Sequence, residues 1–450
     1  YKLSDVKGEK TFSAEIFEGV HLVFIDEGHK GAPGDTWINY REQVIGENGF
    51  SFEYSATFGQ ALSSIDNEQL QNRYVKSILV DYSFRNFHID GFGKEYDILN
   101  LADDDSTRRN KYLTANLLSF YEQKKYFSEN SDDLEDFNLE DPLWIFVGQT
   151  VNAVSGRELT KKDKVSDVEE VVRFLNRVLS DRKTIISEIK DIISGSEFLD
   201  EEGRALFEDR FNYLKAADIS PEEIYQELLD LIFNSSSDAG LNVVRLKNTE
   251  GEIGLRVGSN ENYFGLVNIG SGTTKQFVDR VEENTDIAVE EQEFKSSIFS
   301  ELDSGDSDVN VLIGAKRFTE GWDSYRVSNM GLMRVGRNEG AEIIQIFGRG
   351  IRLRGKDHSL KRTSHLELSE SEIPENIEIL ERLNVFGIKA DYIKEFEDQL
   401  EEEDIPTGFI TKSVETDVNT DLVGDDLKVP RRKEKVSYVE QTVSTLQITE

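Results

Sequence analysis

The sequence contains no cysteine, so it can form neither a disulfide bond nor a metal site with thiolate ligands. Its five histidines are scattered along 450 residues, which argues against a structural zinc site. No apolar run is long enough to span a membrane, and no signal peptide opens the chain. These absences predict a cytoplasmic protein.

Basic residues are also scarce, because 52 Lys and Arg stand against 88 Asp and Glu, a formal net charge of −36. This balance argues against nucleic-acid binding over a broad surface, since phosphate binding normally shows as a basic footprint. Two alternatives remain open. The acidic excess can be an adaptation to a salt-rich cytoplasm, or an acidic surface can surround a narrow basic groove.

The remaining composition is that of a folded protein: 37 % of the residues are hydrophobic, and the length suits two or three domains. Short apolar runs ended by polar residues predict buried strands at residues 20–25, 142–147 and 310–314, and an alternating pattern predicts a further strand at 50–54. Helical patterns occupy residues 111–126, 167–179 and 183–234. Alternating strands and helices predict an α/β fold with parallel sheets, in which ligands bind at the carboxyl ends of the strands.

Composition also suggests where the domains end. Residues 128–141 are polar and acidic, so we expect a linker there, between a first domain at 1–127 and a second at 142–365. An α+β insertion is expected within the second domain at about 183–300. From 366 to 450 we expect a helical and polar extension, with helix over 375–400.

An arginine pair stands out near the end of the second domain, in Gln345-x-x-Gly348-Arg349-x-x-Arg352. A helix at 343–354 would place the arginines on one face and the apolar residues on the other. Arginines presented in this way can neutralise charge on a phosphoryl group during its transfer. A plain surface helix rich in arginine fits the stretch about as well.

Acidic and hydroxyl residues follow the first two predicted strands. Asp26 and Glu27 come directly after the first strand, where one carboxylate can hold Mg²⁺ through water and the other can orient an attacking water. Acidic residues also end strands without such a role. Ser55 and Thr57 end the second strand, and this signal is weak by itself.

In chain order, these motifs resemble motifs II, III, V and VI of the superfamily-2 helicases. The likeness covers about residues 20–400 and is greatest to the helicase subunit of type III restriction enzymes. It rests on Asp26-Glu27-Gly28-His29-Lys30-Gly31, Ser55-Ala56-Thr57, Pro142-Leu-Trp-Ile-Phe-Val-Gly148, Phe318-Thr-Glu-Gly-Trp-Asp-Ser-Tyr-Arg-Val-Ser328, Ile344-Gln-Ile-Phe-Gly-Arg-Gly-Ile-Arg-Leu-Arg354 and Leu383-Asn-Val-Phe-Gly387.

The resemblance implies tandem RecA-like domains, the first of them incomplete, with ATP and Mg²⁺ between them. It implies a metal-binding Asp26, a catalytic Glu27, and Arg349 and Arg352 acting on the triphosphate. It implies that the nucleotide is contacted by His29, Gly321, Asp323 and Gln345. It implies that nucleotide state is coupled to domain closure by His29, Ser55 and Thr57. Glu320 would lie near the nucleotide or the nucleic acid. Thr150, Asn152, Lys316 and Arg317 could touch the nucleic-acid backbone, although an ordinary surface role suits these four better.

One element of the family is absent, because no Gly-x-x-x-x-Gly-Lys-Ser/Thr loop for the phosphates occurs in the chain. Residues 270–275, Gly-Ser-Gly-Thr-Thr-Lys, have the wrong order and spacing, and we interpret them as a turn before a helix. The chain also opens at Tyr1 in mid-pattern. We therefore expect the loop upstream of Tyr1 or on another chain, and little ATP hydrolysis by these residues alone.

The motifs together predict a DNA-stimulated ATPase, a helicase or translocase of a restriction or phage-defence system, with a methyltransferase or specificity subunit as a partner. No nuclease motif is found, so a nuclease would lie beyond Glu450. Two alternatives remain open: a catalytically incomplete scaffold or protein-interaction module, and an RNA helicase.

Overall fold

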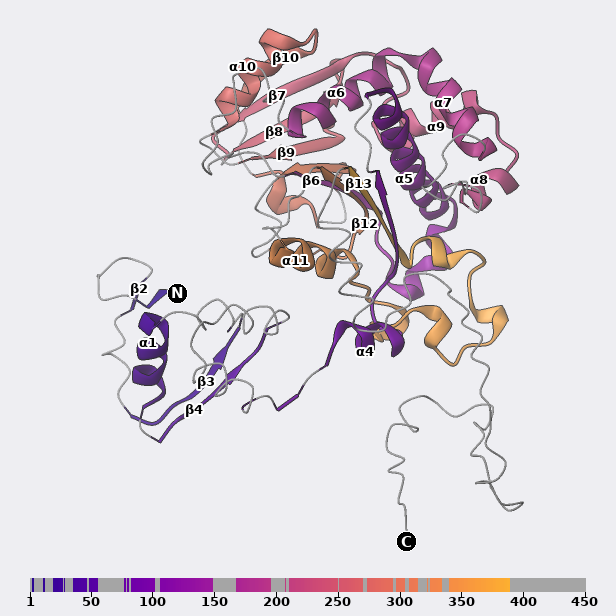
Figure 1. Cartoon of the computed structure of the whole chain (residues 1–450). Helices are drawn as coiled ribbons and strands as arrows, with labels where there is room; N and C mark the ends of the chain where they lie inside the picture. The colour runs from indigo at the N-terminus through magenta and orange to yellow at the C-terminus, as the bar shows by residue number, and fades with distance from the viewer. Residues whose placement is uncertain are drawn as a thin grey trace, which may run out of the picture. The chain divides into compact units, whose positions relative to one another are not determined.

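The computed structural model divides the chain into two compact units, Tyr1–Tyr82 and Ser83–Glu450 (Figure 1). The structure describes residues 2–3, 11–12, 19–26, 28, 35–46, 48–55, 77, 79–80, 82–101, 106–148, 167–195, 207, 210–249, 251–269, 273–293, 297–303, 307–314, 322, 324–333 and 340–388.

The first unit is built on two parallel strands, β3 (Leu22–Ile25) and β4 (Phe50–Glu53), joined through helix α1 (Asp35–Ile45). The positions of both strands confirm the sequence prediction, but the expected burial of the first is wrong, because Leu22 and Phe24 of β3 are 59 % and 63 % exposed. Arg41 of α1 is buried and forms an ion pair of 2.5 Å with Glu53, which ties the helix to the sheet. A further short parallel pair joins β1 (Lys2–Leu3) and β2 (Thr11–Phe12).

The second unit contains a nine-stranded sheet in the order β10-β7-β8-β9-β11-β6-β12-β13-β5. Its strands are β5 (Glu95–Leu101), β6 (Leu143–Gly148), β7 (Leu241–Lys247), β8 (Glu252–Val257), β9 (Gly265–Asn268), β10 (Ala288–Glu293), β11 (Val311–Gly314), β12 (Val327–Met333) and β13 (Arg382–Ile388). Neighbouring strands run parallel except at β8, which is antiparallel to β7 and β9. The protein is therefore an α/β protein with a largely parallel sheet, as the sequence predicted.

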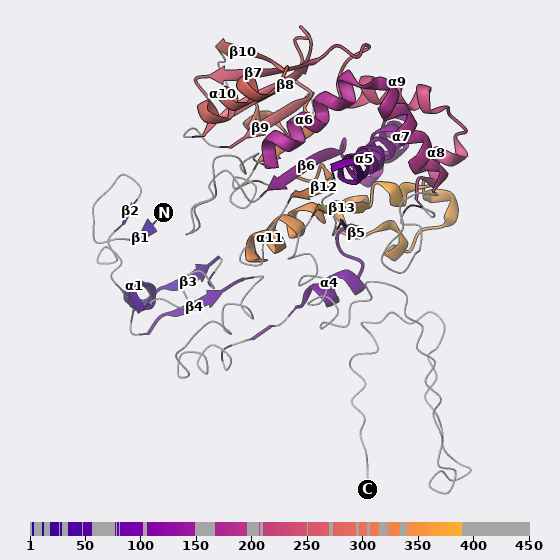
Figure 2. The ribbon, with the colours of Figure 1, turned by 45° about the horizontal axis from the view of Figure 1, so that its top comes forward.

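Helices flank both faces of this sheet (Figures 1 and 2). The described helices are α4 (Phe84–Ile89), α5 (Ser106–Leu134), α6 (Asp167–Ser180), α7 (Arg182–Ser194), α8 (Asn212–Ala216), α9 (Pro221–Leu231), α10 (Thr274–Asn284) and α11 (Gly340–Gly350). Short 3₁₀ turns occur at Glu135–Phe137, Phe299–Glu301, Lys356–His358, Thr363–His365, Glu370–Glu372 and Ile377–Ile379. None of the described helices is both long and apolar enough to cross a membrane.

Side chains that alternate along the strands divide the core into two layers. Trp144 and Phe146 of β6 join the cluster formed with α5, α6, α7, α9 and α10. Ile145 and Val147 of the same strand join the cluster that contains α11. A strand buried on both faces needs apolar residues at successive positions, which is why β6 reads as a continuous hydrophobic run.

Several other predicted elements are confirmed. Helices α5 and α6 contain the predicted 111–126 and 167–179, and β7, β8 and β9 fall within the predicted strand region 241–269. Helix α9 begins at the predicted point, where Ser220 and Glu223 form a reciprocal capping box and Pro221 takes the first helical position.

Three expectations differ from the structure. Residues 128–134 continue α5 instead of forming part of a linker, because Leu134 and Phe137 are buried in a small cluster with Tyr126. The strands of the expected insertion extend the main sheet, where β9 pairs with β11. Helix over 375–400 is wrong for Arg382–Ile388, which is a strand buried between β12 and β5, so residues up to 388 belong to the sheet.

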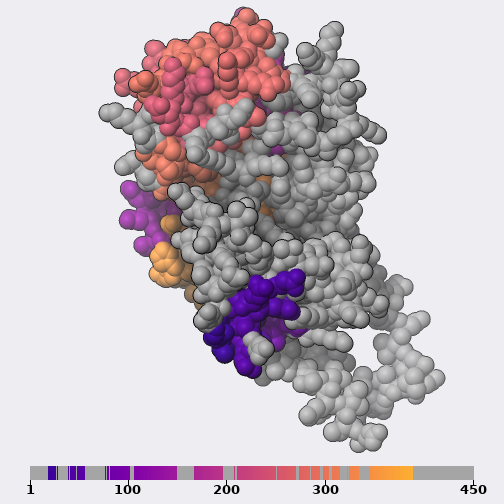
Figure 3. Space-filling model, turned by 90° about the vertical axis from the view of Figure 1, so that its left-hand side faces the viewer, coloured from indigo at the N-terminus to yellow at the C-terminus, as the bar shows by residue number. Residues whose placement is uncertain are grey.

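The edge of the sheet at β10 carries some of the acidic excess. Glu290 pairs with Arg256 at 2.6 Å, and Glu291 pairs with Arg245 at 2.9 Å and with Lys247 at 2.6 Å. The surface of this region is coloured salmon in Figure 3. Charged residues along an exposed edge strand oppose pairing with strands of other molecules.

Candidate functional site

The first unit brings two of the predicted motifs to the same end of its parallel strands. Asp26 directly follows β3 and is exposed, and Ser55 follows β4. The Tyr54 N–H donates to the Ile25 carbonyl at 2.9 Å, and the Gly28 N–H donates to the Tyr54 carbonyl at 3.0 Å. These bonds extend the strand pairing past the strand ends, so the two motifs leave the sheet side by side.

In the second unit, the carboxyl ends of β6, β11 and β12 lie at one edge of the sheet. Strand β6 lies between β11 and β12. The chain therefore passes from β11 on one side of β6 to β12 on the other side, and the strand order changes direction there. In open α/β sheets, ligands bind at such a change of direction. Thr150 follows β6 in the sequence, and Lys316 and Arg317 follow β11, but all three lie outside the described residues.

Helix α11 carries the predicted arginine motif, and its apolar side is buried. Ile346, Phe347 and Ile351 are at most 4 % exposed and pack against β12 and β13. Gln345 and Arg349 are half-buried, and each has interaction partners. The predicted apolar face is therefore confirmed for the described part of α11. The predicted helix over 343–354 is too long at its carboxyl end, because α11 ends at Gly350 and contains only Arg349 of the two motif arginines.

Arg352 lies just beyond the last residue of α11. Its N–H donates to the Arg349 carbonyl at 3.3 Å, which continues the helical turn, and its side chain is half-buried with interaction partners. Gly348 lies on the exposed side of the helix, and no described atom lies within 4 Å of the position that a Cβ would take. The motif thus contains an exposed glycine in the last turn of a helix, where alanine would be favoured by up to about 1 kcal/mol.

Trp322 connects a second predicted motif to α11. This side chain is buried in the same apolar cluster as Ile346 and Phe347, and its ring lies 6.1 Å from that of Phe299. Its sequence neighbours Gly321 and Asp323 lie outside the described residues. Trp322 and the apolar side of α11 therefore share one core.

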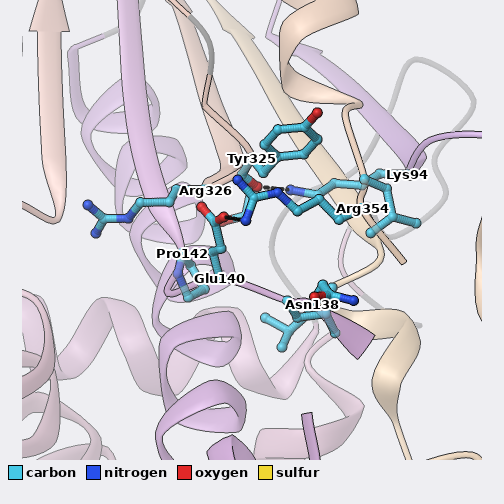
Figure 4. Close-up of a pocket in the computed structure, with 11 residues that line it drawn as sticks. Lys94, Asn138, Glu140, Pro142, Tyr325, Arg326 and Arg354 are labelled. Atoms are coloured by element: carbon cyan, nitrogen blue, oxygen red, sulfur yellow. Dashed lines mark hydrogen bonds and ion pairs between the residues drawn. The ribbon is translucent and has the colours of Figure 1, made fainter. Parts of the chain in front are cut away.

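One further feature has no signal in the sequence: a small pocket around Lys94 at the amino ends of β6 and β12 (Figure 4). The Lys94 side chain is 4 % exposed, and its ammonium donates to the carbonyls of Val327 at 2.5 Å and Tyr325 at 3.2 Å. Its backbone N–H donates to the Ile351 carbonyl at 2.7 Å, just beyond α11. Lys94 is a single lysine before a strand, and its partners lie more than 200 residues away, so no local pattern marks it.

Other charges line the same pocket. Arg354 forms an ion pair of 2.5 Å with Glu140 and lies over the Tyr325 ring, 4.4 Å from its centroid (Figure 4). The cavity volume is about 10 Å³, which suits one water molecule. Burial lowers the pKa of Lys94 to about 7, and the nearby carboxylate of Glu140 only partly opposes this change.

A second ionisable group with a shifted pKa lies on α5, the half-buried carboxyl of Glu122. Burial raises the pKa of Glu122 to about 7, against the opposing effect of hydrogen bonds from the backbone of Leu214 and Tyr213 and of the charges on Arg210 and Arg382. The backbone bonds come from the first turn of α8, where a carboxylate satisfies N–H groups that the helix itself leaves open. Glu122 therefore anchors α8 to α5.

Several predicted site residues cannot be placed, because they lie outside the described residues: Glu27, His29, Thr57, Thr150, Asn152, Lys316, Arg317, Glu320, Gly321 and Asp323. Within the described ranges, no three His, Asp or Glu side chains come together in a way that could hold a metal ion. No family model matches this chain, and no curated protein matches it.

Proposed function

We propose that this chain is part of a DNA-stimulated ATPase of the superfamily-2 helicase type, a helicase or translocase of a restriction or phage-defence system. In this proposal the second unit is a RecA-like domain, and the first unit is the carboxyl-terminal part of another. The phosphate loop would come from a segment outside this sequence or from another chain. A methyltransferase or specificity subunit would be a partner.

The observation that carries the proposal is the packing of α11. Its apolar side is anchored on β12 and β13, which fixes the position of the half-buried Gln345 and Arg349 on the other side of the helix. Arginine presents planar, fixed donors that match the oxygens of a phosphate. Two arginines at the end of a packed helix, Arg349 within α11 and Arg352 just beyond it, are suited to stabilise the charge that develops during phosphoryl transfer.

The motifs of the first unit supply the other half of the proposed chemistry. Asp26 is an exposed carboxylate at a strand end, which fits a ligand that holds Mg²⁺ through water. Glu27 would orient the attacking water and accept its proton, while Arg349 and Arg352 would hold the phosphoryl oxygens. Bound Mg²⁺ would supply neutralisation of the triphosphate charge. Ser55 and Thr57 would couple nucleotide state to movement of the domains.

A scaffold or protein-interaction module is the second candidate function. The observation in its favour is the formal net charge of −36, which suits contacts with basic proteins or mimicry of DNA. In that case the α/β fold would serve binding, and the arginines of α11 would be ordinary surface residues. An RNA helicase would use the same residues as a DNA helicase and differs only in its substrate.

Phosphate release from Mg-ATP by the full-length protein separates these possibilities. The assay is run without nucleic acid, with double-stranded DNA, with single-stranded DNA and with RNA. Stimulation by DNA supports the proposal, and stimulation by RNA alone favours an RNA helicase. No hydrolysis by a protein whose circular dichroism shows it to be folded contradicts an ATPase and favours the scaffold.

A further inference from the structure

We propose that Lys94 is a positioning residue, which fixes the carboxyl end of α11 to the start of β12 and so sets the direction of Arg349 and Arg352. This inference rests on the function proposed for the two arginines. It adds a residue outside every motif that the sequence marks.

The first step is the fixation of the helix end. The last carbonyls of a helix have no partner within the helix and need another donor. The Lys94 N–H meets this need at the Ile351 carbonyl, at 2.7 Å. Gly93 allows the approach, because its φ is +69° and a Cβ there would lie 2.7 Å from the Ile351 oxygen. Residues 93 and 94 are therefore shaped to receive the end of α11.

The second step is the link from Lys94 to the sheet. Its ammonium reaches the carbonyls of Tyr325 and Val327, at the point where β12 begins. Burial of a charge is unfavourable, and methionine would fill similar space without that cost. The contribution specific to lysine is therefore the pair of directed hydrogen bonds. One residue joins the helix end to the strand start, through its backbone on one side and its side chain on the other.

The third step is the support given to the next residues of the chain. Arg354 is held by Glu140 and by the Tyr325 ring, and the Asn138 side chain donates to the Gly355 carbonyl at 3.0 Å. Residues 351–355 are thus bound by three segments that are distant in sequence. Arg352 lies in this stretch and Arg349 one turn before it, so loss of the anchor would let both arginines move. A misplacement of about 1 Å can cost roughly a hundredfold in rate.

The test compares Lys94→Met with Lys361→Met in the full-length protein. Lys361 is a suitable control, because its ammonium lies over the Phe92 ring at 4.7 Å and, among the described residues, has no hydrogen bond or ion pair with α11. Hydrogen exchange measured by mass spectrometry reports on residues 347–355. Steady-state kinetics with Mg-ATP reports on the arginines, and thermal unfolding reports on the fold.

We expect Lys94→Met to speed exchange in 347–355 by about tenfold or more, with no change in 112–126 on α5. We also expect kcat to fall by about tenfold or more with little change in KM, while the midpoint of thermal unfolding at pH 7 does not fall. A residue that only stabilised the fold would lower that midpoint and leave kcat unchanged in the folded fraction. Lys361→Met should match wild type in all three measurements.

Unchanged exchange in 347–355, or unchanged kcat with faster exchange, overturns the inference. If Lys94→Met does not fold, Glu140→Gln takes its place, because it weakens the hold on Arg354 at the same helix end and is expected to speed exchange there. Arg352→Ala is measured in parallel. If Arg352→Ala retains full activity, or if wild type does not hydrolyse ATP, the proposed function fails, and the role of Lys94 in positioning the arginines fails with it. In that case the hydrogen-exchange result alone decides whether Lys94 anchors α11.

Discussion

Replacement of Lys94 by methionine should change how the stability of the protein depends on pH. Burial lowers the pKa of the Lys94 ammonium from 10.5 to about 7 in the folded protein. Between these values the unfolded chain holds a proton that the folded chain has released, so the free energy of unfolding rises with pH. Below pH 7 both states carry the proton, and the cost of burying the charge is present in full.

The size of this effect follows from the two pKa values. They correspond to roughly 5 kcal/mol in total, or about 1.4 kcal/mol for each pH unit between 7 and 10.5. The charged side chains that line the pocket with Lys94 are those of Glu140, Arg326 and Arg354. They are present in both proteins, so the difference between wild type and variant isolates the lysine.

Urea unfolding of wild type and Lys94→Met between pH 6 and 9 measures this difference. We expect the free energy of unfolding of wild type, relative to the variant, to rise by about 2 kcal/mol from pH 7 to pH 9, since Lys94 is already half-deprotonated at pH 7 in the folded protein. Lys361→Met should follow wild type across the whole range. Parallel curves for wild type and Lys94→Met would refute the reasoning, because they would mean that Lys94 keeps an ordinary pKa when folded.

Three further substitutions test other parts of the structure. Gly348→Ala should raise the free energy of unfolding by about 1 kcal/mol, because the exposed face of α11 has room for a methyl group; a loss of stability in urea would contradict this. Glu122→Gln should gain roughly 3 kcal/mol in free energy of unfolding relative to wild type as pH rises from 4.5 to 7. The reason is that Glu122 stays protonated in folded wild type over this range, whereas the same carboxyl ionises in the unfolded chain. A difference between the two proteins that stays constant over these pH values would argue against this reasoning. Ser220→Ala removes the capping box of α9 and should cost about 1 kcal/mol in thermal unfolding, whereas Ser220→Thr should retain most of the stability.

The parts of the fold that could be predicted share a clear local pattern. Strand β6 is a continuous apolar run because both of its faces are buried, and α9 begins at a Ser-Pro-Glu-Glu sequence that satisfies its own first N–H groups. Strand β13 was missed because acidic and apolar residues alternate irregularly around it. Its partners β12 and β5 decide its conformation, and they are distant in the sequence.

The candidate site was predictable to a different extent in each unit. Arg349 and Arg352 are marked by helical spacing, and Asp26 and Ser55 by their positions after apolar runs. Lys94 carries no such mark, since its role arises only when residues 94, 140, 325–327 and 351–354 meet at one end of the sheet. Contacts that close over such long stretches of chain depend on the completed fold, and a local sequence pattern contains no information about them.

The most direct test of the proposed motor is the effect of Arg352→Ala on DNA-stimulated ATP hydrolysis by the full-length protein. Arg173→Ala is the matched control, because Arg173 is an arginine of α6 with a 41 % exposed side chain that pairs with Glu169. The proposal predicts a loss of roughly a thousandfold in kcat for Arg352→Ala, with wild-type circular dichroism and an unchanged rate for Arg173→Ala. Equal rates for wild type and Arg352→Ala would contradict the role of α11 in phosphoryl transfer.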